Sequence, residues 1–132
     1  MKKVSASVAA LASLAALLVT AAPADAWERP PATIFAVLPD GSTGPEGLTV
    51  GSDGNVYVTT FGFNASGPVD GNGRLFVFGP DGRLRRQVAI AGSSVHLLGL
   101  AFHPTTGALL VLDFGSGQVL RVDPATGRPP SS

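Results

Sequence analysis

The chain has 132 residues, nine basic and nine acidic side chains, a net charge of zero at pH 7 and no cysteine. The lack of cysteine excludes disulfide bonds, thiolate metal centres and a cysteine nucleophile. The balanced charge gives no support for binding nucleic acid or an anionic membrane, since both partners select a cationic surface.

Residues 1–26 have the pattern of a secretory signal peptide. Two lysines form a basic start, an apolar stretch spans residues 8–19, and residues 24–26 (Ala-Asp-Ala) supply a cleavage site flanked by small side chains. The apolar stretch is shorter than the about 20 residues that a membrane-spanning helix needs. We therefore expect a secreted or periplasmic protein that is cleaved after about Ala26 and has no stable membrane anchor.

After the signal segment, short β-forming runs alternate with Gly, Pro and Asp turns such as Asp53-Gly54 and Asp81-Gly82. Helical periodicity is not evident in this part of the sequence. The pattern predicts eight strands, at 32–38, 47–50, 55–60, 74–78, 84–91, 98–102, 108–113 and 118–122. They are followed by a polar tail at 128–132.

Two stretches that begin at Gly47 and Gly99 repeat one pattern: an apolar strand, a Gly-containing turn and a second strand that ends at Phe-Gly. Such a tandem meander is typical of β-propeller blades. The fold class is therefore predicted to be all-β, with residues 27–127 forming a partial β-propeller of about two four-stranded antiparallel meanders. The first blade has four predicted strands, whereas the second has three, so the ring is incomplete.

The predicted strand at 32–38 precedes the first blade and is expected to be an outer strand of a neighbouring blade. The repeat predicts that the buried layer is shared by corresponding positions in the two blades. These positions are Leu48, Val50, Val56 and Val58 in the first blade and Leu100, Phe102, Leu110 and Leu112 in the second. Because an uncovered terminal blade leaves apolar surface, we expect self-association or additional blades.

The runs Gly99-Leu-Ala-Phe and Leu110 to Asp123 resemble blade repeats of the senescence-marker-protein/gluconolactonase/luciferin-regenerating-enzyme family, and those of the related NHL repeats. The resemblance covers residues 43–127. Pro45-Glu46-Gly47-Leu48 is similar to that family's Glu-Gly pair, which lies just before the innermost strand of its first blade. The resemblance implies that Glu46 is a ligand of a divalent cation (Ca, Mn or Zn). It also implies metal-dependent hydrolysis of a small-molecule lactone, sugar-like ligand or ester.

The catalytic residues remain unassigned, and two further side chains are candidates. Asp113 ends a strand beside Phe114-Gly115, where an acidic side chain commonly ties loops together by accepting backbone hydrogen bonds. His96 precedes the inner strand of the second blade, on the same side as Glu46. In the sequence, no third residue is evident that would orient His96.

Three other interpretations remain open. The chain could be a non-catalytic NHL-like repeat module for binding, or a truncated remnant without activity. The run Leu97 to Pro104 also resembles a phrase of quinone-dependent sugar dehydrogenases, which makes a fragment of that family a third alternative.

Overall fold

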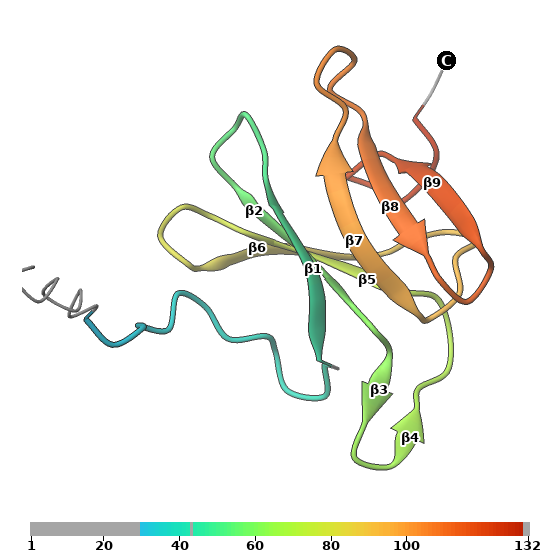
Figure 1. Cartoon of the computed structure of the whole chain (residues 1–132), viewed down its shortest axis with the longest axis horizontal. Helices are drawn as coiled ribbons and strands as arrows, with labels where there is room; N and C mark the ends of the chain where they lie inside the picture. The colour runs from blue at the N-terminus through green and yellow to red at the C-terminus, as the bar shows by residue number, and fades with distance from the viewer. Residues whose placement is uncertain (1–29, 43, 131–132) are drawn as a thin grey trace, which may run out of the picture. The chain divides into compact units, whose positions relative to one another are not determined.

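The computed structural model describes residues 30–42 and 44–130. Within this part the chain is all-β, which confirms the predicted fold class, and no helix there has the length and hydrophobicity to cross a membrane. The predicted signal peptide lies outside the described residues. The strands are β1 (Pro45–Val50), β2 (Val56–Thr60), β3 (Phe63–Asn64), β4 (Gly67–Pro68), β5 (Arg74–Phe78), β6 (Leu84–Ala89), β7 (Leu97–Phe102), β8 (Leu109–Asp113) and β9 (Gln118–Val122), shown in Figure 1.

The first blade, blade 1, is a four-stranded antiparallel sheet with strand order β1-β2-β5-β6. A small hairpin of β3 and β4 is inserted between its second and third strands (Figure 1). The sequence did not predict this hairpin, because Gly67-Pro68 lacks the β-branched pattern of a strand. The blade is therefore a complete meander with a two-stranded extension at one end.

The turn between β1 and β2 is stabilised by one carboxylate. Asp53 accepts hydrogen bonds from the Asn55 backbone N–H at 3.0 Å and from the Tyr57 hydroxyl at 2.8 Å. Gly54 in this turn has a φ of 76°, a conformation that glycine adopts without steric cost. The hydrogen bond from Tyr57 is the main cause that lowers the pKa of Asp53. This turn therefore keeps β1 and β2 in register at the end of the blade remote from Glu46.

The second blade, blade 2, has three antiparallel strands in the order β7-β8-β9. The core lies between the two blades. Tyr57, a blade 1 residue, meets Phe102 of blade 2 edge to face with ring centroids 5.0 Å apart. The buried members of this core are Tyr57, Leu75, Val77, Ile90, Leu97, Leu100, Leu109, Val111 and Val122.

The buried layer of β8 differs by one residue from the prediction. Leu109 and Val111 face the core, whereas Leu112 is 44% exposed. The run from 109 to 112 is entirely apolar, so no alternation marks the buried side. In the strand pairing, Val56 of blade 1 corresponds to Leu109 of blade 2, and Val58 corresponds to Val111. Their partners on the neighbouring strands correspond in the same way.

The strand predicted at 32–38 is not formed. Residues 30–39 contain no strand, and the segment from 34 onward packs on blade 1 through side chains instead of a ladder. Ala36 and Leu38 lie on a second apolar cluster, formed by Val58, Phe76 and Phe78. A β-forming sequence needs a partner edge to become a strand, and here the segment covers the face of a sheet.

The two blades approach each other most closely where β1 meets β7. A Cβ atom at Gly47 would collide with the Leu98 carbonyl oxygen and would lie 2.5 Å from Thr59 Oγ1 and 2.8 Å from Leu100 Cδ2. The Thr59 hydroxyl donates a hydrogen bond of 2.5 Å to the same Leu98 oxygen. Only a residue without a side chain permits this spacing of the inner strands.

We expect Gly47→Ala to lower the free energy of unfolding by about 1–3 kcal/mol, because overpacking at this contact must push the inner strands apart. Urea denaturation followed by circular dichroism measures the loss. Gly44→Ala is the matched control, since a Cβ there meets nothing within 4 Å. Equal stability of the two variants would contradict the close contact.

Candidate functional site

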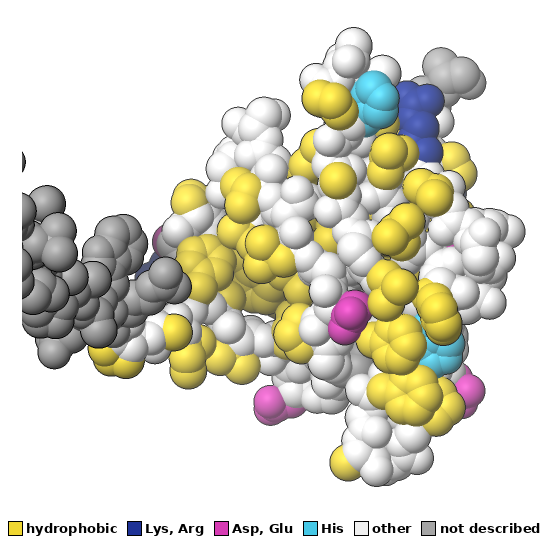
Figure 2. Space-filling view, in the orientation of Figure 1, with side chains coloured by type: hydrophobic (Ala, Val, Ile, Leu, Met, Phe, Trp, Pro, Cys, Tyr) yellow, Lys and Arg dark blue, Asp and Glu magenta, His cyan; other side chains and the backbone are white. Residues whose placement is uncertain are grey.

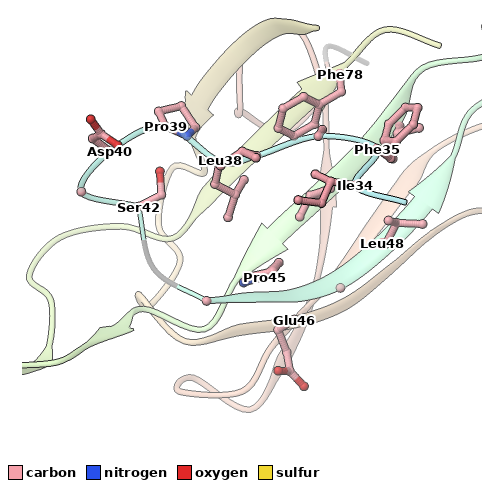
Figure 3. Close-up of a pocket in the computed structure, with 17 residues that line it drawn as sticks. Ile34, Phe35, Leu38, Pro39, Asp40, Ser42, Pro45, Glu46, Leu48 and Phe78 are labelled. Atoms are coloured by element: carbon pink, nitrogen blue, oxygen red, sulfur yellow. The ribbon is translucent and has the colours of Figure 1, made fainter. Parts of the chain in front are cut away.

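Glu46 lies in a β-bulge at the start of the inner strand β1. Pro45 pairs with Thr60 and Gly47 pairs with Thr59, so Glu46 is an extra residue without a ladder partner. Its side chain is exposed, and it points away from the side chains of Phe35, Leu38 and Phe78 (Figure 3). Bulges re-aim side chains at the ends of strands, and here the bulge frees a carboxylate from the sheet.

Blade 2 carries a bulge at the same place in its own inner strand. Leu97 pairs with Asp113 and Leu100 pairs with Val111, which leaves two β7 residues opposite Leu112. Leu98 therefore occupies the repeat position of Glu46. Both inner strands contain the bulge, but only blade 1 has a carboxylate at the bulged position.

His96 is held just before β7 by a backbone acceptor from blade 1. Its Nδ1 is 2.7 Å from the Phe61 carbonyl oxygen. A carbonyl accepts and cannot donate, so Nδ1 carries the proton and Nε2 has the free lone pair in the neutral ring. The orienting group that the sequence did not show is thus a main-chain oxygen 35 residues away.

Phe61 and Phe63 lie against the His96 ring, and Phe114 contacts Phe61; we call these four residues the aromatic cluster. Phe61 and Phe63 stack at 5.7 Å, and the His96 ring lies 5.0 Å from Phe61 and 5.3 Å from Phe63. The ring centroid of Phe114 lies 6.0 Å from that of Phe61, and Phe114 is 62% exposed. Figure 2 shows hydrophobic side chains gathered at the surface near β3 and the adjoining ends of β7 and β8.

Sequence reasoning did not assign a role to these phenylalanines. A signal was present, because Phe61 and Phe114 are the residues of the two Phe-Gly pairs that end the repeated phrases. The repeat brings both to the same end of the blades, next to the loop that carries His96. This is also the end at which β1 begins with Glu46.

Asp113 is buried at the end of β8 and ties loops together. One oxygen accepts the Ser94 backbone N–H at 2.9 Å, and the other accepts the Ser94 hydroxyl and the Ser116 backbone N–H at 3.2 Å. The Ser94 hydroxyl oxygen in turn accepts the His96 backbone N–H at 3.2 Å. Asp113 thus fixes the loop that positions His96.

Burial raises the pKa of Asp113, but the hydrogen bonds from Ser94 and Ser116 outweigh burial, and the pKa is held below its ordinary value of 3.8. The carboxylate form is therefore the form that the fold stabilises. The role of the buried, ionised Asp113 is therefore to hold the geometry of the neighbouring loops.

The described residues contain no group of three or more His, Asp or Glu side chains arranged to hold a metal ion. Glu46 contributes one carboxylate, whereas hard cations such as calcium take six to eight oxygen ligands. By themselves, the described residues of this chain do not fit a cation site.

Comparison with known families supports the architecture. Residues 34–61 match the family model described as strictosidine synthase-like, N-terminal, which represents a β-propeller-related family. The match spans about a fifth of the chain: the segment before β1, then β1, which contains Glu46, and β2. A search of curated proteins found no match. The family match confirms the relationship to propeller proteins that the repeated phrases predicted.

We expect Asp113→Asn to lower the free energy of unfolding at pH 7 by about 1–3 kcal/mol, because one buried acceptor becomes an amide donor facing N–H groups. A group whose folded pKa is depressed stabilises the fold above its unfolded pKa and loses that contribution as the pH falls through the folded pKa. The difference between wild type and Asp113→Asn should therefore shrink below about pH 4.

Urea denaturation of both proteins at pH 7 and pH 3 measures this effect, with the exposed Asp70→Asn as control. A difference that is the same at the two pH values would show that the charge of Asp113 does not stabilise the fold.

Proposed function

We propose that this chain is a two-blade unit of an exported propeller hydrolase. When further blades complete the ring, the assembled protein cleaves a sugar lactone or a related ester. The observation that carries this proposal is the bulge at Glu46, which releases a carboxylate at the start of an inner strand. The Glu-Gly pair of the gluconolactonase-like resemblance lies at this position.

The contact at Gly47 determines which strand lies next to Glu46. Because Gly47 lies against the Leu98 carbonyl, the start of β1 lies beside the start of β7. Inner strands surround the axis of a propeller, so carboxylates at their starts converge as blades are added. A divalent cation held there would polarise the substrate carbonyl and activate water. Other blades must supply the remaining oxygen ligands.

The family match covers the region around Glu46. It spans β1, β2 and the bulge between Pro45 and Gly47, and so supports the propeller interpretation of this segment. The choice of hydrolysis rests on the Glu-Gly pair. His96 is a candidate proton acceptor, because its Nε2 is the nitrogen left without a proton in the neutral ring.

Glu46→Gln should lower the rate of lactone hydrolysis at least about 100-fold, because a neutral amide is a poor ligand for a hard cation. The assay uses a sugar lactone with calcium, manganese or zinc added back after chelation. Asp40→Asn is the matched control, since Asp40 is an exposed carboxylate a few residues before Glu46. Full activity in Glu46→Gln would remove Glu46 from the site.

A second candidate function is binding of a sugar-like ligand without catalysis. The aromatic cluster favours it, because exposed aromatic rings pack against the apolar faces of flat or cyclic ligands. Phe114 and Phe63 both have exposed ring surface, at 62% and 45%. In this function Glu46 is not required.

We expect Phe114→Ala to weaken binding of a sugar or sugar lactone about twofold to twelvefold in isothermal titration calorimetry, as loss of one aromatic contact of about 0.5–1.5 kcal/mol implies. Val119→Ala is the control, because Val119 is equally exposed but lies on β9 outside the cluster. Unchanged binding in Phe114→Ala would exclude the cluster as the ligand surface.

A further inference from the structure

The outer face of blade 2 repeats a face that blade 1 buries. Gly47 and Thr59 lie on the side of blade 1 that packs against blade 2, and the register places Gly99 and Leu112 at the same positions of blade 2. Thr59 is fully buried, whereas Leu112 is 44% exposed. This free face of blade 2 comprises Gly99, Ala101, Leu110, Leu112, Val119 and the exposed Arg121. Arg121 stands where blade 1 has the buried Val77, and Figure 2 shows hydrophobic side chains at the surface over β8 and β9.

The opposite side of blade 1 repeats the face that blade 2 presents to the core. Leu48 corresponds to Leu100, yet Leu48 is 65% exposed and Leu100 only 9%. Val50 corresponds to Phe102, which packs on the core, and Val50 is 58% exposed. We call this side the free face of blade 1. It comprises Leu48, Val50, Val56, Val58, Phe76 and Phe78, of which Val58, Phe76 and Phe78 are buried beneath the segment before β1.

The strongest difference between the two blades is the space around Gly47 and Gly99. A Cβ atom at Gly47 would collide with the neighbouring blade, whereas a Cβ at Gly99 would meet only Leu112 Cδ1 of its own blade, at 3.8 Å. The φ of Gly99 is outside the left-handed region, so its backbone does not require glycine. Neither space nor backbone in the single chain explains a glycine here, but a second inner strand at blade spacing would.

We infer that a second copy of this chain docks on the free face of blade 2 through its own free face of blade 1. The junction continues the interface between the blades within each chain. Gly99 of one copy then lies against the Glu46 carbonyl and the Leu48 side chain of the next, as Gly47 lies against the Leu98 carbonyl and Leu100. Such head-to-tail contacts form a closed ring of about four to eight blades from two to four copies.

The segment before β1 occupies part of the free face of blade 1. Ala36 and Leu38 contact Val58, Phe76 and Phe78, which a preceding blade would otherwise cover. A groove of about 980 Å³ remains between this segment and the sheet, and Leu48 is one of its lining residues (Figure 3). The segment must therefore shift when a second copy enters.

This docking goes beyond the proposed hydrolysis and does not depend on it. Its readout is the mass of the protein without substrate or metal. A ring of copies would bring each Glu46 next to a junction, and loss of activity with intact association would leave the docking in place.

Sedimentation equilibrium of the purified protein over a range of concentrations tests the docking. The wild type should reach a defined mass of two to four copies, and Gly99→Val should raise the dissociation constant at least about tenfold. At concentrations where the wild type is monomeric, its urea midpoint and that of Gly99→Val should be equal. Phe114→Ser, which removes a comparably exposed side chain outside both faces, should associate as the wild type does.

A second variant, Leu48→Arg, blocks the other side of the same junction. A mixture of Gly99→Val and Leu48→Arg retains one intact pair of faces and should form a 1:1 dimer that grows no further. A wild type that stays monomeric at about 100 μM would overturn the proposal, as would normal association of both variants. Leu112→Arg replaces Gly99→Val if the valine variant does not fold.

Discussion

The approach of two inner strands at a single glycine is the constraint on which the rest of the structure depends. Gly47 lets β1 come close enough to β7 for Thr59 to donate to the Leu98 carbonyl. That spacing aligns the two sheets face to face and closes the core between them. It also brings the strand starts together, so that Glu46 and the loop before β7 share one end of the blades.

At that end, polar and aromatic contacts together hold the loops in place. Asp113 binds Ser94 and Ser116 as an ionised carboxylate, and Ser94 passes the constraint to the backbone of His96. The Phe61 carbonyl fixes the His96 ring from the other blade. Two blades thus suffice to position a histidine, whereas a cation needs oxygen donors from more than one bulge.

The sequence predicted the features that local chemistry determines. Alternating strands, Asp-Gly turns and the repeated phrase predicted both blades. The sequence could not predict what depends on distant partners. The segment at 32–38 has strand-forming residues but meets the face of a sheet and no strand edge. The one-residue error at Leu110 and Leu112 arose because an all-apolar strand carries no alternation. The Phe61 carbonyl that orients His96 leaves no mark in the sequence.

The central claim is that the exposed faces of the two blades are halves of one repeated interface. Because the chain has no cysteine, cross-linking between introduced cysteines tests this directly. Chains carrying Leu110→Cys are mixed with chains carrying Val50→Cys and treated with a short bismaleimide, and the products are separated by mass under denaturing conditions. The account predicts cross-linked dimers that contain one chain of each kind, since these positions repeat the contact between Tyr57 and Phe102. Dimers formed equally well by either variant alone, or no cross-link, would contradict it.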